Sequence, residues 1–181
     1  MPSRSLRPYC PAIVAIVFLI ALPSGHCAAQ QDDDSGIWGL VGADWMGVGD
    51  ELAAGVLGEL GYRRGRLCLG ARMLYASEVD MIDWGSSEKP RKLYELGPVV
   101  GVQSDWRFLK VQANIGISLI TGELLEASTH SRTNAVGFPV EIGLFVVVRR
   151  TPRVFGIGMG GFGNLGVGSF GGIGVYFLAM R

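Results

Sequence analysis

The sequence predicts an all-β chain whose eight antiparallel strands close into an up-and-down barrel that spans a membrane. The first observation is a period of two, in which apolar residues alternate with polar or small ones along most of the chain. The second is strand length: the alternating segments run for 10–15 residues, whereas soluble strands usually have about five or six and a tilted membrane-crossing strand needs roughly 9–11. The third is that the long connections alternate with short ones, as in membrane barrels.

The first 29 residues have the three parts of a secretory signal peptide. Arg4 and Arg7 precede an apolar run of eleven residues, Ala12–Leu22, and small residues up to Ala29 offer a cleavage site. The run is much shorter than the ~20 residues of a membrane-spanning helix, so a membrane anchor is the weaker alternative. We expect residues 1–29 to be the signal peptide, residues 30–35 a polar lead-in and residues 36–181 the barrel.

The first four strands are expected at residues 37–47, 51–62, 66–77 and 93–103. In the last three of these, one parity is mainly apolar, while the other mixes glycine with single charges such as Glu59, Arg72 and Glu95. In a soluble sandwich the polar row is rich in Lys, Glu and Thr, because it faces water. Glycine and small residues instead suit a crowded lumen.

The other four strands are expected at residues 106–120, 136–149, 154–163 and 167–180. The segment 106–120 shows the alternation most clearly, and the last two strands form a glycine-rich closing hairpin. Pro98 and Pro139 lie inside predicted strands. A closed barrel has no edge at which a missing N–H is harmless, so we expect a β-bulge at each proline.

The connections predict which end of the barrel is which. The second, fourth and sixth are short, at residues 63–65, 104–105 and 150–153, and the two longest are the third and fifth, at residues 78–92 and 121–135. The long loops therefore share the outer end, and both chain termini lie at the periplasmic end. Aromatic residues on the outward parity gather near strand ends, as in interfacial girdles: Tyr62, Tyr75, Tyr94, Phe138, Phe155 and Phe177.

Over residues 36–181 the chain resembles the small eight-stranded outer-membrane barrels of the OmpA/OmpX-like superfamily. The resemblance is carried by the strand Phe108–Gly122, which ends in Ile-Thr-Gly, and by the closing hairpin from Phe155 to Gly166. It implies a location in the bacterial outer membrane, contact with outer-membrane lipids including lipopolysaccharide, and insertion by the barrel assembly machinery. The resemblance is architectural and brings no specific activity and no cofactor.

Five charged residues fall on the inward parity of five consecutive strands: Glu59, Arg72, Glu95, Lys110 and Glu141. Isolated charges in a narrow interior are costly unless they are paired and hydrogen-bonded, so their mixed signs predict an ion network around the lumen. Arg72 and Glu95 form the expected central pair, because they lie on neighbouring strands at similar distances from one outer loop. Lys110 is expected to meet Glu141 or Glu59. The remaining groups would be satisfied by nearby amides: Gln103, Gln112 and Asn114.

Surface charge differs between the two ends. The short turns are basic: Arg63, Arg64, Arg66, Arg107, Arg149, Arg150 and Arg153. The outer loops are mostly acidic, and only a few cations there are candidates to contact lipopolysaccharide phosphates: Lys89, Arg91, Lys92 and Arg132.

An enzymatic alternative depends on His130. The stretch that begins at His130 is faintly similar to the His-x-Ser-Asn-Ala signature of lipid A deacylase barrels, with one inserted residue and Thr133 in place of the serine. A Ser-His-acid site here would use Ser131 as nucleophile, His130 as base and Glu126 or Glu141 as the orienting acid.

Composition and motifs exclude several other classes of function. Sixteen basic and sixteen acidic residues balance, which removes the electrostatic argument for a nucleic-acid partner. Two matches to G-x-G-x-x-G, at residues 156–161 and 166–171, lack the helix and the distant acid of a dinucleotide site, so we expect no nucleotide. After signal cleavage only Cys68 and His130 remain of their residue types, so we expect no disulfide, metal or cofactor.

The leading interpretation is a small closed barrel with a structural or surface-interaction role and no enzymatic activity. Eight strands leave a lumen that side chains fill, and four bulky residues lie on the inward parity: Leu57, Leu74, Phe145 and Phe170. The alternatives are the lipid A-modifying enzyme and a soluble secreted β-sandwich or lipocalin-like binder.

Overall fold

The structure, a computed structural model, describes residues 35–79, 90–106, 108–124, 134–150, 153–166 and 169–181. The predicted signal peptide therefore lies outside the described residues. The described strands are β1 (Ser35–Val48), β2 (Glu51–Arg64), β3 (Leu67–Glu78), β4 (Lys92–Trp106), β5 (Leu109–Gly116), β6 (Ser118–Thr121), β7 (Asn134–Arg150), β8 (Arg153–Gly166) and β9 (Phe170–Met180). No helix in this part of the chain is long and apolar enough to cross a membrane.

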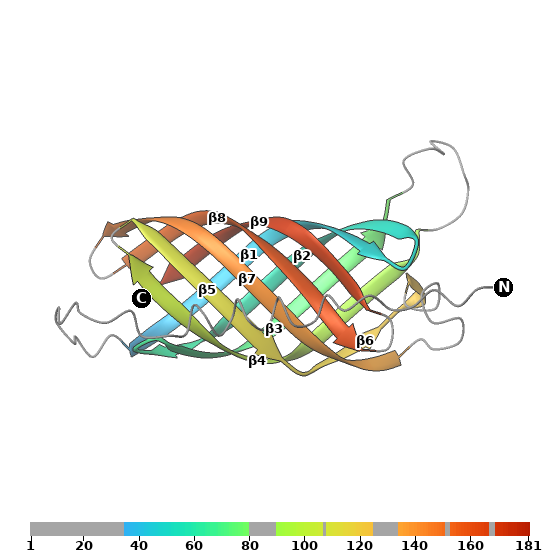
Figure 1. The fold of residues 1–181 in the computed structure, drawn as a ribbon, viewed down its shortest axis with the longest axis horizontal. Coiled ribbons are helices and arrows are strands. Elements are labelled where there is room, and N and C mark those ends of the chain that lie inside the picture. Colours follow the sequence, from blue (N-terminus) through green and yellow to red (C-terminus); the bar gives the residue numbers. More distant parts are fainter. Residues whose placement is uncertain (1–34, 80–89, 107, 125–133, 151–152, 167–168) are drawn as a thin grey trace, which may run out of the picture. The chain divides into compact units, whose positions relative to one another are not determined.

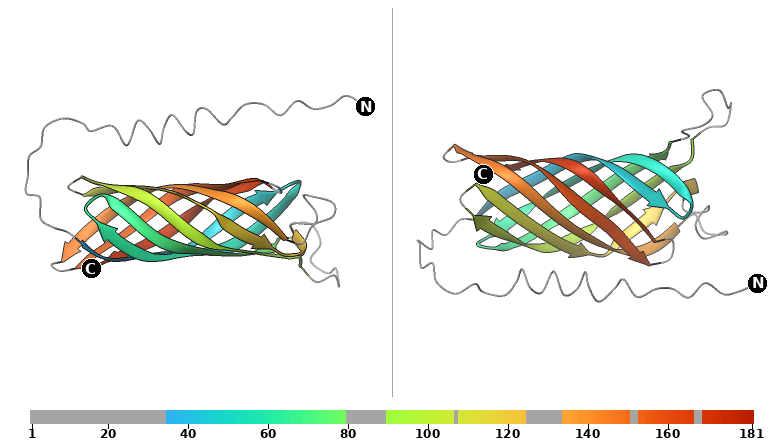
Figure 2. Two further views of the ribbon diagram at one scale, coloured as in Figure 1. Left: turned by 90° about the horizontal axis from the view of Figure 1, so that it is seen from below. Right: turned by 45° about the horizontal axis from the view of Figure 1, so that its top comes forward.

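These strands form one closed antiparallel sheet (Figures 1 and 2). Closure comes from β1, which pairs with β2 on one side and with β9 on the other. β5 and β6 are two parts of one wall strand, because both pair with β4 and with β7. The wall thus has the eight strands that the sequence predicts, and the predicted fold class is confirmed. The β-sandwich alternative is wrong, because the sheet is single and closed.

The two ends of the barrel differ in their connections. At one end, which we call the loop end, lie the β1–β2 turn, the β8–β9 connection and the two long connections after β3 and β6. At the other, the turn end, lie the short connections, the start of β1 and the end of β9. The β1–β2 and β2–β3 turns each have two residues and begin with a glycine at positive φ, Gly49 at 62° and Gly65 at 60°, a conformation that glycine adopts without strain.

The β4–β5 turn lies further along the chain than predicted. The sequence analysis places it at residues 104–105, but β4 continues to Trp106, which pairs with Leu109. The preceding pair is Asp105 with Lys110, so cross-strand pairing extends the hairpin beyond the predicted turn. Trp106 and Phe108 therefore flank the turn and are exposed, although the simple alternation places them with the lumen residues.

The prediction of a bulge at each proline is also wrong. On both sides of Pro98, the pairing of β4 with β5 and β6 follows one register. Pro139 pairs with Asn164 inside the unbroken β7–β8 register. The alternation of side chains between the inner and the outer face of the sheet therefore continues without a shift along both strands.

The two prolines instead flank one point of the wall strand between them. The register places Ile117 opposite Pro98 and Gly116 opposite Pro139. Ile117 N–H donates to the Pro98 carbonyl at 3.2 Å, but a proline has no N–H to donate in return. The missing ladder bonds explain why this wall strand is interrupted between β5 and β6.

Every wall strand turns apolar side chains outward. A mid-strand residue from each is 45–62% exposed: Val41, Val56, Met73, Val100, Ile115, Leu144, Ile157 and Val175. An apolar belt of this extent is far larger than the patches that soluble monomers expose, which argues against a soluble lipocalin-like binder. Aromatic pairs lie near both ends, with ring centroids 5.2 Å apart for Tyr75–Tyr94 and 6.2 Å for Phe155–Phe177.

Candidate functional site: a buried ion network and two charged ends

The interior holds all five of the charged residues that the sequence places there. Glu59, Arg72, Glu95, Lys110 and Glu141 come from β2, β3, β4, β5 and β7, and each is at most 4% exposed. Strict alternation along unbulged strands is what brings them to the inner face, since successive side chains point to opposite sides of the sheet.

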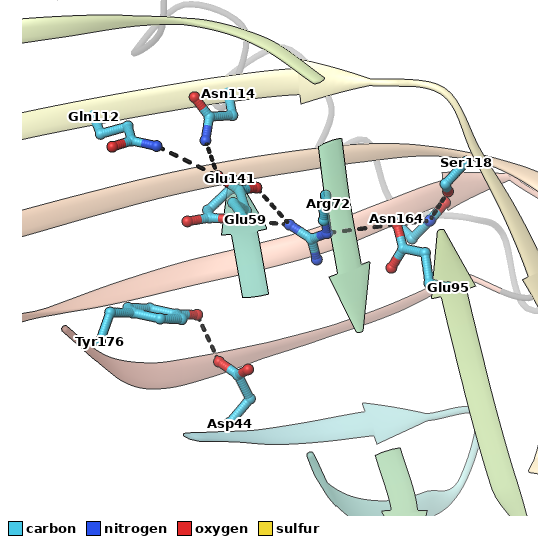
Figure 3. A network of polar contacts seen from close by, with 10 residues as sticks. All are labelled: Asp44, Glu59, Arg72, Glu95, Gln112, Asn114, Ser118, Glu141, Asn164 and Tyr176. Carbon is cyan, nitrogen blue, oxygen red and sulfur yellow. Dashed lines mark hydrogen bonds and ion pairs between the residues drawn. The ribbon is translucent and has the colours of Figure 1, made fainter. Parts of the chain in front are cut away.

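Arg72 is the centre of this network (Figure 3). Its Nη1 donates to Glu141 Oε2 at 2.9 Å, its Nε lies 3.6 Å from Glu95 Oε1, and its Nη1 lies 4.0 Å from Glu59 Oε1. The guanidinium also lies over the Phe162 ring, with Cζ 5.3 Å from the ring centroid. The sequence prediction centres on Arg72 and Glu95, whereas the hydrogen bond goes across the lumen to Glu141.

A chain of amides connects the network to Lys110. Asn114 Nδ2 donates to Glu59 Oε2 at 2.7 Å, and Gln112 Nε2 lies 3.4 Å from the same oxygen. Gln103 Nε2 donates to Gln112 Oε1 at 2.7 Å, and Lys110 Nζ lies 3.4 Å from Gln103 Oε1. Lys110 thus reaches Glu59 through two glutamine side chains, and its direct pairing with a glutamate stays a prediction.

Four further polar residues belong to the interior and were not anticipated. Asn164 Nδ2 donates to both Glu95 Oε1 and Ser118 Oγ at 3.0 Å. Separately, the Tyr176 hydroxyl donates to Asp44 Oδ1 at 2.6 Å. The alternation along β1 and β8 could have predicted two of them, because it places Asp44 and Asn164 on the inward face.

Glycines make the space that these side chains occupy. A Cβ at Gly174 would overlap Asp44 Oδ1, and a Cβ at Gly137 would overlap the Asn164 amide. The inward glycines are therefore part of the network, since any larger residue would displace a hydrogen-bonding group.

Apolar clusters close the interior at both ends of the network. At the loop end they comprise Val48, Ala53, Leu74, Ala76, Leu93, Ile120, Leu124 and Phe170. At the turn end they comprise Trp38, Cys68, Phe145, Val147, Leu178 and Met180. Leu124 is fully buried although it follows the end of β6, so it adds to the apolar cluster at the loop end. The described residues contain no cluster of three metal-ligating side chains.

A second cluster of ion pairs, centred on Arg91, lies at the rim of the loop end. Arg91 donates from Nε and Nη2 to Glu78 at 2.9 and 2.8 Å, and its Nη2 also lies 2.8 Å from Glu51 Oε1. We call these three residues the rim clamp. Glu78 lies three residues beyond Tyr75 of the outer aromatic girdle, and the hydrogen bond from Arg91 holds the pKa of this carboxyl below its ordinary value.

The rim clamp bears on the predicted lipopolysaccharide contacts. Arg91 is already engaged by two glutamates, whereas Lys92 is exposed. Lys89 and Arg132 lie outside the described residues. So do His130, Ser131 and Glu126 of the enzymatic alternative, while Glu141 lies in the interior in contact with Arg72, away from any site on the outer loops.

The fold defines a class by its architecture: the small, closed, eight-stranded antiparallel β-barrels. Among solved structures, the chain is similar to Neisserial surface protein A, with a TM-score of 0.54 and 13% identity over 80% of this chain and 95% of that one. It also matches Ail, the attachment invasion locus protein of Yersinia pestis, with a TM-score of 0.46 and 11% identity over 81% of this chain and 96% of that one. No protein-family model and no curated protein sequence matches the chain. The first likeness shows the fold alone.

Proposed function

We propose that the protein is a closed, non-enzymatic barrel of the bacterial outer membrane with a structural or surface-interaction role. The observation that carries this proposal is the filled interior, in which an ion network lies between two apolar clusters. A barrel built in this way is a rigid support for the segments that leave its loop end, residues 79–91 and 122–133.

The orientation follows from the connections. Long connections at one end and short ones at the other are the pattern of bacterial outer-membrane barrels, which places the loop end outside the cell. Residues 1–29 act as the signal peptide, and the barrel assembly machinery inserts the chain. Lys92, at the rim of the loop end, is then a candidate contact for lipopolysaccharide phosphates, together with Lys89 and Arg132.

Two measurements test the proposal. We expect the mature chain in the outer-membrane fraction, with faster migration of the unboiled than of the boiled sample on gels. Recovery as a soluble periplasmic protein would contradict the membrane assignment. In planar bilayers the pure protein should give no reproducible single-channel steps, because the loop end of the lumen is filled with apolar side chains.

The enzymatic alternative has its own test. Lipid A acylation is compared between cells that produce the wild-type protein and cells that produce His130→Ala. We expect no difference. A change in acylation that depends on His130 would replace the structural role with a catalytic one.

A further inference from the structure

The turn end carries a band of exposed arginines. Arg64, Arg66, Arg153 and Arg181 are all exposed, and they come from the β2–β3 hairpin, the start of β8 and the residue after β9. This band differs from the loop end, where two glutamates neutralise Arg91 and Lys92 is exposed. An exposed basic band at one end of a membrane barrel is suited to bind an anion at that level.

Two of these arginines face outward, toward the surroundings of the barrel and not into its lumen. Arg153 continues the exposed row of Ile157 and Phe155 along β8, and Arg181 continues the row that contains Phe177 in β9. Phe155 lies one same-face step inside Arg153 and Phe177 lies two inside Arg181, and their rings pack against each other. Aromatic belts lie at the membrane–water interface, so the guanidinium groups lie at the level of the lipid headgroups.

The strand register brings these like charges together. Val154 pairs with Met180 at the end of the β8–β9 register, so Arg153 and Arg181 are the residues that directly adjoin this last pair. In the neighbouring hairpin Arg153 is the register partner of Arg150. Like charges directly opposite each other destabilise a sheet, and no ion pair among the described residues engages Arg153 or Arg181. The Arg181 N–H donates to the Ile37 carbonyl of β1 at 2.9 Å, on the other side of β9 from Arg153.

We propose that Arg153 and Arg181 bind the headgroup of a net-anionic glycerophospholipid in the leaflet that surrounds the turn end. The planar guanidinium fork matches the geometry of a phosphate and donates two parallel hydrogen bonds to it. A phosphate between the two side chains relieves their repulsion. A zwitterionic headgroup does so less well, because its ammonium group adds a third positive charge. The outward facing of both arginines favours a lipid over a soluble acidic protein.

The proposal rests on the membrane location given above. Its test distinguishes a failure of lipid binding from a failure of the barrel proposal. The purified mature chain is folded in neutral detergent micelles, and folding is checked by the gel shift of unboiled samples. Dioleoylphosphatidylglycerol or dioleoylphosphatidylcholine is then added in equal amounts, and the thermal unfolding midpoint is measured. Because a surface arginine gains on the order of one tenfold step from an anionic lipid, we expect phosphatidylglycerol to raise the midpoint about 2–4 °C more than phosphatidylcholine.

The double variant Arg153→Gln/Arg181→Gln should fold and lose this lipid difference. The matched control Arg66→Gln removes an exposed arginine of the same end, in the β2–β3 turn, and should keep it. Arg153→Lys/Arg181→Lys keeps both charges without the planar fork and should retain only part of the difference. Single Arg153→Gln and Arg181→Gln variants, each expected to lose part of it, serve if the double variant does not fold.

Four results would overturn the proposal. One is a lipid difference that survives in Arg153→Gln/Arg181→Gln, or in both single variants. Another is its equal loss in Arg66→Gln. The third is an equal rise of the midpoint with soluble polyglutamate or inorganic phosphate, which would assign the band to an acidic protein or to free anions. A chain that folds in micelles but shows no lipid difference contradicts this inference and leaves the barrel proposal standing.

Discussion

Two arginines of this barrel have similar partners and opposite surroundings. Arg72 lies among Glu59, Glu95 and Glu141 in the interior, where its side chain is 1% exposed. Arg91 binds two glutamates at the rim, where its side chain is 35% exposed. The contact distances are alike, with a shortest N–O separation of 2.9 Å inside and 2.8 Å at the rim.

The difference teaches that contact geometry alone does not set the energy of an ion pair. At the rim, water stabilises each charge when the partner is removed, so an exposed pair contributes little. Inside, no comparable solvent replaces a lost partner, and an unpaired buried charge is strongly destabilising. The interior cluster also has more carboxylates than guanidinium groups, so its single arginine is shared.

The largest expected effect is that of Arg72→Met. This change leaves three buried carboxylates without their common cation, and we expect the free energy of unfolding to fall by about 3–5 kcal/mol. The measurement is reversible urea unfolding in detergent or lipid, followed by tryptophan fluorescence. Unchanged stability would show that lumen water screens the network.

The double variant Arg72→Met/Glu141→Gln sharpens this result. Removing the carboxylate that Arg72 contacts most closely should recover about 1 kcal/mol or more of the loss, because residues in one ionic network couple by about 0.5–3 kcal/mol. The control is Arg72→Met combined with Lys92→Gln, a distant surface change whose effect should simply add. Additive behaviour in both double variants would disprove the coupling.

A smaller effect is expected for Arg72→Lys. Lysine keeps the positive charge but has no planar fork to contact glutamates on three strands at once. We expect a loss of about 1.5–3 kcal/mol, the range for a hydrogen bond to a charged group. If Arg72→Lys is as stable as wild type, the positive charge alone accounts for the stabilisation by the network. If Arg72→Lys loses as much stability as Arg72→Met, the planar geometry of the guanidinium group accounts for it.

At the rim, Arg91→Met should cost only about 0.2–1 kcal/mol. The same unfolding assay measures this change, and the effect should shrink further in high salt because the pair is exposed. If Arg91→Met lowered the free energy of unfolding as much as Arg72→Met does, the difference in energy inferred between the buried and the exposed cluster would be wrong.

The smallest expected effect is a pH dependence carried by Glu78. Its folded-state pKa is lowered by the Arg91 hydrogen bond, so its contribution is present above the ordinary glutamate pKa and is lost as the pH falls through the lowered value. Wild type should therefore be slightly more stable than Glu78→Gln at neutral pH, and the difference should decrease once the pH falls below the ordinary glutamate pKa of about 4.3. A difference that grows on acidification would have the wrong sign.

Much of the fold is predictable because a period of two fixes which side of the sheet each residue faces. It assigns Glu59, Arg72 and Glu141 to the interior without any knowledge of the turns. It does not locate the turn after Trp106, because residues that flank a hairpin keep the same alternation whether or not they are paired. Nor does it show that two prolines on neighbouring strands share one interruption, which depends on register.

The sequence predicts which charged residues form the interior network, but it does not predict which of them contact each other. Sequence places Arg72 and Glu95 on adjacent strands, and they do lie 3.6 Å apart. The shorter contact, to Glu141, joins residues 69 positions apart across the lumen. Such a contact depends on barrel diameter, strand stagger and the space left by Gly137 and Gly174, none of which the alternation specifies.

The paired prolines have a consequence for the chain before it reaches its membrane. Consecutive valines occur at only two places in the sequence, residues 99–100 and 146–148, and each lies in a strand that contains one of the prolines. Long β-branched segments are prone to add foreign strands and aggregate while unfolded in water. A proline removes the N–H that such intermolecular pairing needs. The N–H groups that Pro98 and Pro139 lack in the finished wall are thus also donors that these two strands do not offer to foreign strands before the barrel closes.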